Sequence, residues 1–194
     1  MSLTERILGN AVLYDGIQRV AGMERLRRRL SPVLGTLEAG TLLDVGAGTG
    51  AFYDLLPERV TYVALDVDAR KLERLHAKHG DVEGVVGSAD ALPFEADAFE
   101  YTLCTNVAHH LSDADFEHMV SELGRVTSRQ LVFVDPLRAN RLASRMLWSI
   151  DRGSYPRSYE QLVEGLSSRF ASEHVEAFTI LHRYLLFVGG PREG

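Results

Sequence analysis

From Thr41 onward, short apolar runs alternate with amphipathic stretches along this 194-residue chain. Alternation of this kind is typical of strands that pair in parallel, with a helix crossing between them. We therefore expect an α/β fold with a doubly wound, mostly parallel sheet of seven strands. The expected strands are residues 41–45, 60–66, 82–87, 101–107, 130–134, 174–181 and 183–188. The last two are close enough in sequence to pair as an antiparallel terminal hairpin.

Helices are expected between these strands and before them. The N-terminal residues 4–38 read as helical, with an amphipathic helix that ends near Pro32. A short helix is expected before Pro57, and others follow the capping residues Asp68, Ser112 and Ser158. A further helix is expected over residues 139–150.

One domain accounts for residues 4–192, because no long linker or internal repeat divides them. It comprises an N-terminal helical lid (4–38), a core (40–135) and a C-terminal part with substrate-side helices and the hairpin (136–190). The net charge of −6 argues against a nucleic-acid partner. No apolar run is long enough for membrane insertion, and we expect a cytoplasmic protein. The single cysteine, Cys104, lies in an apolar strand and is expected to be buried and inert.

The run Leu42–Gly50 carries most of the functional information. It is an apolar strand that enters a turn with glycines at positions 46, 48 and 50, which lets a ligand lie against bare backbone. This spacing also fits a relaxed dinucleotide fingerprint. Asp66 ends the next strand, where its carboxylate can accept hydrogen bonds from ribose hydroxyls. These features indicate a nucleoside ligand without distinguishing its kind.

Asp44 discriminates between the candidate ligands. A carboxylate just before the turn repels a pyrophosphate but attracts a ligand that carries ammonium and sulfonium charges, as S-adenosylmethionine does. The residues therefore favour S-adenosylmethionine over NAD.

Four motifs in order, LLDVGAGTG, VALDVD, GSADALPF and CTNVAHHLSD, resemble those of the class I S-adenosylmethionine-dependent methyltransferases, most closely the small type-11 kind. The resemblance covers residues 40–135. It implies a Rossmann-like methyltransferase fold with N-terminal helices, S-adenosyl-L-methionine as cofactor and S-adenosyl-L-homocysteine as product.

The resemblance also implies roles for individual residues. The loop Gly46-Ala47-Gly48-Thr49-Gly50 would line the methionine part of the cofactor, with Asp44 near its amine and Asp66 on the ribose. The resemblance also implies that Val67 and the segment Ser88-Ala89-Asp90 lie near the adenine. In this segment the family often has an acid where Ser88 stands, whereas here Asp90 is the acid. Asn106 matches a position whose backbone lies near the methionine moiety.

The candidates for catalysis are His109 and His110, which follow the fourth strand at the carboxyl edge of the sheet, where open α/β folds bind ligands. Either imidazole can act as a general base near neutral pH, and either can instead be a structural hydrogen-bonding group. The other histidines show no metal-ligand spacing, so no metal is expected.

Acceptor contacts are expected from two segments. The turn-rich stretch before the sixth strand contributes Arg152, Tyr155 and Arg157, and the resemblance implies that Tyr14 covers the cofactor as part of a lid. The alternative is that the turn-rich stretch is an ordinary polar connection and that Tyr14 packs in the core.

The sequence thus predicts methyl transfer from S-adenosylmethionine to an oxygen, nitrogen or carbon atom of a small molecule. Two alternatives remain: a non-catalytic S-adenosylmethionine-binding sensor or partner protein, and an NAD-dependent oxidoreductase. The sequence does not identify the acceptor, and a homodimer that shares its acceptor site stays open.

Overall fold

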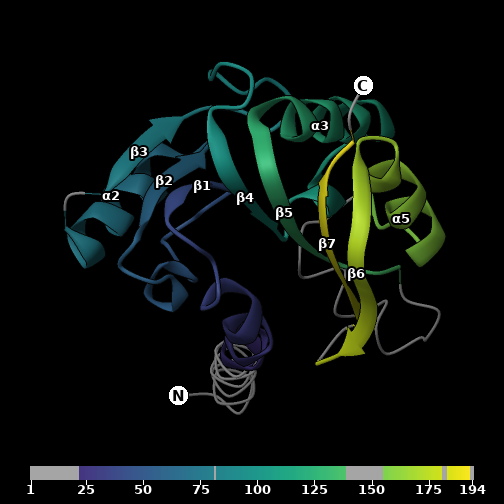
Figure 1. Cartoon of the computed structure of the whole chain (residues 1–194), viewed down its shortest axis with the longest axis horizontal. Coiled ribbons are helices and arrows are strands. Elements are labelled where there is room, and N and C mark those ends of the chain that lie inside the picture. Colours follow the sequence, from purple (N-terminus) through teal and green to yellow (C-terminus); the bar gives the residue numbers. More distant parts are fainter. Residues whose placement is uncertain (1–21, 81, 139–154, 181–182, 193–194) are drawn as a thin grey trace, which may run out of the picture.

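The computed structural model describes residues 22–80, 82–138, 155–180 and 183–192. These residues form one seven-stranded sheet in the order β3-β2-β1-β4-β5-β7-β6 (Figure 1). The strands are β1 (Gly40–Val45), β2 (Val60–Asp66), β3 (Glu83–Val86), β4 (Phe99–Thr105), β5 (Thr127–Pro136), β6 (Phe170–Thr179) and β7 (Arg183–Pro191). The first five pair in parallel, whereas β7 is antiparallel to β5 and to β6. The expected doubly wound sheet with a terminal antiparallel hairpin is confirmed.

The strand order reverses next to β1. The chain passes from β1 outward to β2 and β3, then returns to the other side of β1 as β4 and continues to β5. The carboxyl ends of these parallel strands therefore meet at one edge, with a crevice where the order reverses. The segments that follow β1, β2 and β4 all emerge at this carboxyl edge.

The helices begin where their capping residues predict. They are α2 (Ala69–His79), α3 (Asp113–Val126) and α5 (Tyr159–Ser167), with a further helix over residues 22–34. The side chains of Asp68 and Ser112 accept hydrogen bonds from backbone amides of the first turns of α2 and α3. Ser158 forms a full capping box with Gln161 at the start of α5. Each cap satisfies an amide that the helix itself leaves without a partner.

Two apolar cores lie on opposite faces of the sheet, because successive side chains of a strand point to opposite faces. On one face, Leu43 and Val45 of β1 belong to the core that contains the buried residues of α3 and α5. On the other, Leu42 belongs to the core that contains Leu26, Leu30 and Leu34 of the helix at 22–34, together with residues of α2. Helices cover both faces, as the alternating pattern requires.

Several boundaries differ from the sequence prediction. The helix expected before Pro57 is only a 3-10 turn, η1 (Tyr53–Leu55), because residues 51–59 are too few for a helix and its two connections. The fourth strand ends at Thr105 and not at residue 107, because Asn106 has a positive φ of 57° and turns the chain. Pro32 does not end the first helix, which continues to residue 34.

The other strand boundaries shift by a few residues. The fifth strand and both hairpin strands are longer than expected, and the third is shorter. The helix expected over 139–150 and residues 1–21 of the expected N-terminal helical lid lie outside the described residues.

The contact between α3 and α5 gives a test of the packing. A Cβ atom at Gly165 of α5 would lie 2.5 Å from Cε1 of Phe116 on α3, so Gly165→Ala forces the two helices apart. Alanine favours a helix by about 1 kcal/mol over glycine. We nevertheless expect a net loss of about 1 to 3 kcal/mol in the free energy of unfolding, because overpacking outweighs propensity.

Urea unfolding measures this loss. The matched control is Glu164→Ala, at the exposed neighbouring position of the same helix, which should change the free energy of unfolding by no more than about 0.5 kcal/mol. A Gly165→Ala variant as stable as the wild type would show that the close approach of the two helices is wrong.

Candidate functional site

The glycine loop at residues 46–50 is fastened to β2 by its own amides. The amides of Gly46 and Ala47 both donate to the carbonyl oxygen of Leu65, at 2.8 and 3.0 Å. The Gly48 amide donates to Oδ2 of Asp66 at 3.0 Å, and the Gly50 amide to the Ala47 carbonyl at 3.0 Å. These four amides are therefore satisfied within the protein and do not form a free cradle for a phosphate.

Backbone conformation explains all three glycines, because each has a positive φ, which is 73° at Gly50. Gly46 has a φ of 75°, and a Cβ atom there would overlap the side chain of Val107, which follows β4. Gly48 has a φ of 58°, and a Cβ there would meet nothing within 4 Å. The loop thus packs closely against the segment after β4 on one side. At Gly48 it leaves bare backbone next to open space, where a ligand can approach.

Asp66 ends β2 and is almost fully buried, with 3% of its surface exposed. Besides the Gly48 amide, its carboxylate accepts from the Asp68 amide at 2.9 Å, and Lys71 Nζ lies 3.3 Å from both of its oxygens. The amides fix the orientation of the carboxylate, whereas the half-exposed lysine is a partner that a ligand can displace. Asp66 is therefore a preformed acceptor at the carboxyl edge of the sheet.

Asp44, the second-last residue of β1, accepts a hydrogen bond from one donor within the described part of the chain. It is 1% exposed, and its Oδ2 accepts from the hydroxyl of Tyr62 at 2.7 Å. Its Oδ1 is buried and has no hydrogen-bond partner within the described part of the chain. Burial raises the pKa of Asp44 to about 7, the Tyr62 hydrogen bond partly opposes this shift, and the charge of Asp66 adds to it.

The residues expected near an adenine lie beside Asp66. The Gly87 amide donates to the Asp66 carbonyl at 3.2 Å, which holds the start of the segment 87–91 against the end of β2. In this segment Ser88 donates a hydrogen bond to Asp90, and Ala89 is buried. Val67 is 68% exposed, which is unusual for a large apolar side chain. The structure brings these residues to one place, and their contact with a ligand stays a prediction.

The two histidines occupy a 3-10 turn, η2 (Ala108–His110), directly after Asn106 and Val107. His109 is 2% exposed and its Nδ1 lies 3.0 Å from Oδ1 of Asp135 on β5. Oδ2 of Asp135 accepts from the Ala108 amide at 2.9 Å. His110 is exposed, and its ring centroid lies 4.0 Å from that of His109.

Asp135 is a residue that the sequence analysis missed. A carboxylate only accepts hydrogen bonds, so Asp135 accepts one from Nδ1–H of His109, and Nε2 is then the basic nitrogen of the neutral ring. The available signal was an acidic residue at the end of the apolar run LVFVD, in the position that Asp44 and Asp66 take on their own strands.

Arg157 also contacts the histidine turn. It is 4% exposed, and it donates to the carbonyl oxygens of Ala108 at 2.6 Å and Leu111 at 2.9 Å, and to Asp113 at 2.8 Å. The guanidinium also lies 4.3 Å from the centroid of the Phe116 ring. These contacts account for the position of Arg157 without a substrate, and its expected contact with an acceptor stays a prediction.

The other expected site residues are placed as follows. Tyr155 is 46% exposed, and its amide donates to the His109 carbonyl at 3.1 Å, so it lies at the histidine turn. Tyr14 and Arg152 lie outside the described residues. Cys104 is buried, as expected, and burial raises the pKa of its thiol.

The described ranges hold neither a metal-ligand cluster nor a membrane-spanning helix. Among residues 22–80, 82–138, 155–180 and 183–192, no group of three or more histidine, cysteine or acidic side chains is arranged to hold a metal ion. None of the helices in the same ranges is long and apolar enough to cross a membrane.

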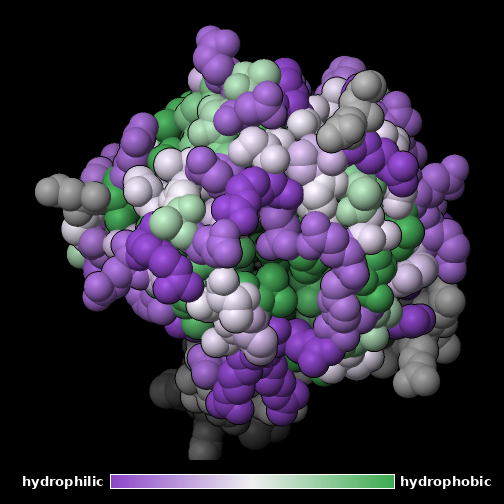
Figure 2. Space-filling view, in the orientation of Figure 1, coloured by the Kyte–Doolittle hydropathy of each residue, from purple (hydrophilic) through white to green (hydrophobic). Residues whose placement is uncertain are grey.

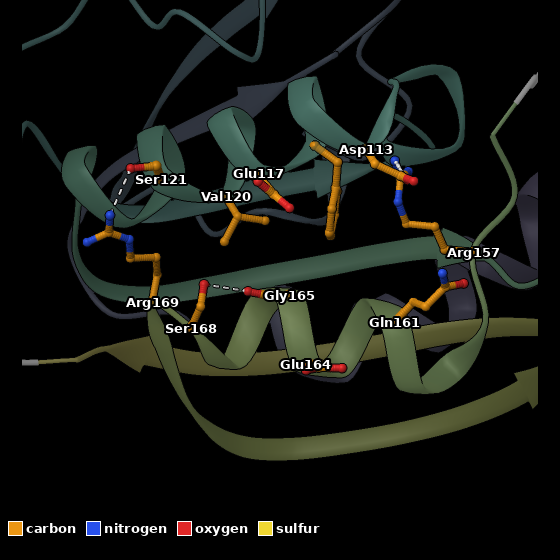
Figure 3. A pocket seen from close by; sticks show the side chains of 11 residues that line it. Asp113, Glu117, Val120, Ser121, Arg157, Gln161, Glu164, Gly165, Ser168 and Arg169 are labelled. Carbon is orange, nitrogen blue, oxygen red and sulfur yellow. Dashed lines mark hydrogen bonds and ion pairs between the residues drawn. The ribbon is translucent and has the colours of Figure 1, made fainter.

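A groove of about 720 Å³ lies between α3 and α5, away from the glycine loop (Figure 3). Its wall combines the apolar Phe116 and Val120 with acidic side chains of both helices and with Arg169, which donates to Ser121. Residues 46–50 and the turn η2 do not line it. Arg157, at one end, is the residue that reaches from this groove to the histidine turn.

A second hollow is visible on another part of the surface. Figure 2 shows apolar residues gathered in a recess that hydrophilic residues surround, between the helix at 22–34 and the β6–β7 hairpin of Figure 1. The partly buried Phe178 and Tyr184 belong to the core on this side, with their rings stacked 5.7 Å apart. Tyr184 pairs with Pro136 of β5, next to Asp135, so the start of β7 lies at the carboxyl edge.

Comparisons with known proteins agree with this architecture. Residues 42–130 match a family model described as a methyltransferase domain. An uncharacterized methyltransferase-like protein of Schizosaccharomyces pombe is 31% identical over 93 residues, which are 46% of this chain and 34% of that protein. The match thus spans about a third of the length of this curated relative.

Two solved structures illustrate the shared fold. Geranyl diphosphate C-methyltransferase of Streptomyces coelicolor, bound to Mg²⁺, geranyl diphosphate and S-adenosyl-L-homocysteine, superposes with a TM-score of 0.72 at 12% identity, over 87% of this chain and 82% of that one. A complex of the Haloferax volcanii Trm112 methyltransferase activator with a presumed methyltransferase gives a TM-score of 0.75 at 15% identity, over 94% and 97%. The fold expected from the resemblance is confirmed: residues 42–130 match a methyltransferase-domain model, and the chain shares its fold with the two solved structures.

Proposed function

We propose that this chain transfers the methyl group of S-adenosylmethionine to an oxygen, nitrogen or carbon atom of a small molecule. The observation that carries the proposal is the pair of buried carboxylates, Asp44 and Asp66, on either side of a glycine loop in which the amides of Gly46, Ala47, Gly48 and Gly50 are bonded within the protein. Negative charge beside a loop with most of its amide donors occupied disfavours a pyrophosphate and favours a cation. The match to a methyltransferase domain supports the same ligand.

The residues of the loop fit S-adenosylmethionine. Asp66 would accept hydrogen bonds from the ribose hydroxyls, which would replace its 3.3 Å contact with Lys71. The open space at Gly48 would take the methionine part. The Asp44 carboxyl, whose Oδ1 has no hydrogen-bond partner among the described residues, supplies a negative charge nearby when it is ionised. The arrangement counts against an NAD-dependent oxidoreductase, because the pyrophosphate of NAD would lie at the glycine loop beside Asp44.

The cofactor supplies a methyl group on a sulfonium leaving group, so the protein mainly aligns the acceptor, excludes water and removes a proton. His109 is our candidate for the proton acceptor, with Nδ1 held by Asp135 and Val107 of the same segment packed on the glycine loop. Because His109 is nearly fully buried, it would meet an acceptor inside a closed, water-poor site. His110, exposed beside it, is the alternative base.

A small acceptor is supported by two observations. An apolar recess lies beside the β6–β7 hairpin, which pairs with β5 next to Asp135, and the net charge of −6 disfavours a polyanion. The Streptomyces coelicolor neighbour is itself bound to geranyl diphosphate, a small molecule. A non-catalytic S-adenosylmethionine-binding protein would bind the cofactor equally well, and turnover separates the two functions.

The first test concerns Asp66. We expect Asp66→Ala to weaken S-adenosylmethionine binding by about 10- to 150-fold, equivalent to about 1.5 to 3 kcal/mol, because a buried acceptor of two ribose hydroxyls is lost. Isothermal titration calorimetry measures the change.

Asp68→Ala is the matched control for this measurement. It removes an exposed carboxylate two residues further on, which caps α2. This variant should lose helix stability by about 1 kcal/mol while it keeps wild-type affinity. Equal affinity of Asp66→Ala and the wild type would remove Asp66 from the site.

The second test separates catalysis from binding at the histidine turn. With an acceptor found by a homocysteine-release screen, we expect His109→Gln to lower kcat by about 10²- to 10⁴-fold, the usual contribution of a general base. Cofactor affinity should stay within about threefold of the wild type.

His110→Gln is the control on the same turn. If its kcat falls as steeply while that of His109→Gln does not, His110 is the base and our assignment is wrong. A His109→Gln variant that loses only unfolding stability, at unchanged kcat, would show a structural role for His109.

A further inference from the structure

The Asp44 carboxyl is a buried acid without a cationic partner. Within the described residues its hydrogen-bond donor is the Tyr62 hydroxyl, on the neighbouring strand β2, and its Oδ1 has no partner. A buried carboxylate with one donor is costly when ionised, because desolvation penalises the charged form. Consistent with this cost, burial raises the pKa of Asp44 to about 7.

The titratable groups around Asp44 belong to β2, η1 and β4. Tyr62 and Asp66 belong to β2, and burial followed by the charge of Asp44 raises the pKa of Tyr62, so its hydroxyl stays protonated. Tyr53 of η1 lies with its ring centroid 5.2 Å from that of Tyr62. Cys104 on β4 is paired opposite Val45 and, like Tyr62, is kept neutral by burial.

His79 and Arg27, two basic side chains on this side of the sheet, interact with Asp54. The ring centroid of His79, on α2, lies 4.5 Å from that of Tyr53, and its Nδ1 is 3.4 Å from a carboxylate oxygen of Asp54. Arg27 of the first helix lies 3.7 Å from the other carboxylate oxygen of Asp54. Both side chains therefore lie beside Asp54, and among the described residues Asp44 has the Tyr62 hydroxyl as its hydrogen-bond donor.

We propose that Asp44 and Tyr62 form a proton-linked recognition site for the positive charge of the ligand. The Asp44 carboxyl carries a proton while the glycine loop is empty and gives this proton to the solvent when a cationic ligand binds, so that the ligand's charge replaces it. Tyr62 is a positioning residue: its hydroxyl orients the carboxylate and sets the pH at which the exchange occurs. The inference rests on the proposed function, because it takes S-adenosylmethionine as the ligand.

The exchange makes binding release protons. Calorimetry of S-adenosylmethionine binding in buffers of different ionisation enthalpy gives the number released. With a pKa of about 7 for Asp44 in the free chain, we expect about half a proton at pH 7 and nearly one at pH 6. At pH 6 the ligand's own α-amino group, with an ordinary pKa of about 7.7 to 8.0, is already charged, so the protons come from the protein.

Three variants assign the protons to the pair. Asp44→Asn should abolish the proton release. In the wild type the proton competes with the ligand, so affinity should fall below pH 7, and this variant should not show that fall. Tyr62→Phe removes the hydrogen bond that lowers the pKa of Asp44, so this variant should release more than half a proton at pH 7. Tyr53→Phe keeps the aromatic contact with Tyr62 and should release the wild-type number.

The ligand-free protein gives a second readout. Because the folded pKa of Asp44 lies above its unfolded value of about 3.9, the folded state holds the extra proton between about pH 4 and 7. Its contribution to stability is therefore present at low pH and lost as the pH rises through 7. The urea midpoint of the wild type should fall relative to that of Asp44→Asn between pH 5 and 8.

The possible outcomes separate this inference from the proposed function. If S-adenosylmethionine gives no binding heat at any pH, the proposed function fails. If it binds but the heat is independent of the buffer at pH 6 and 7, the function stands and the proton exchange is wrong. Identical proton counts for Tyr62→Phe and the wild type would overturn the role of Tyr62, even where Asp44→Asn does not fold.

Discussion

The attachment of the glycine loop to the end of β2 is the constraint on which the rest of the site depends. Two amides of the loop share the Leu65 carbonyl, and a third donates to the carboxylate of Asp66. These bonds fix the positive φ angles of Gly46 and Gly48, which an ordinary side chain would resist. They also consume the donors that a dinucleotide-binding loop would turn toward a phosphate. One set of hydrogen bonds thus shapes the ligand surface and restricts the charge of its ligand.

The segment after β4 extends this arrangement toward catalysis. Val107 fills the space that the missing side chain of Gly46 leaves, so the histidine turn cannot move independently of the loop. Asp135 and Arg157 then hold the turn from two further elements, one through the Ala108 amide and His109, the other through the Ala108 carbonyl. Three acidic residues at strand ends, Asp44, Asp66 and Asp135, therefore organise the carboxyl edge. Each is at most 3% exposed, and each has a different partner.

Local patterns explain how much of this could be predicted from the sequence. Strand alternation, the capping residues Asp68, Ser112 and Ser158, and the glycine spacing are all short-range signals, and each appears in the structure. The sequence also placed Asp44, Asp66 and the two histidines at strand ends, which parallel pairing brings to one edge.

The remaining features depend on contacts between distant residues. Nothing in the sequence near position 157 shows that its guanidinium is buried on carbonyl groups around residue 110, or that Asp135 rather than a nearer acid pairs with His109. The short η1 in place of a helix follows from the length of the connection, which periodicity alone does not reveal. The state of the Asp44 carboxyl depends on burial and on one tyrosine of the adjacent strand, and both are set by the packed sheet.

The most direct test of the account is calorimetry of the unmodified chain with S-adenosylmethionine, S-adenosylhomocysteine and NAD at pH 7.5. Two buried carboxylates beside a loop with satisfied amides predict binding of the first two ligands and no heat from NAD. Binding of NAD alone would contradict the assignment of Asp44 and Asp66 to a cationic nucleoside, and with it the proposed methyl transfer.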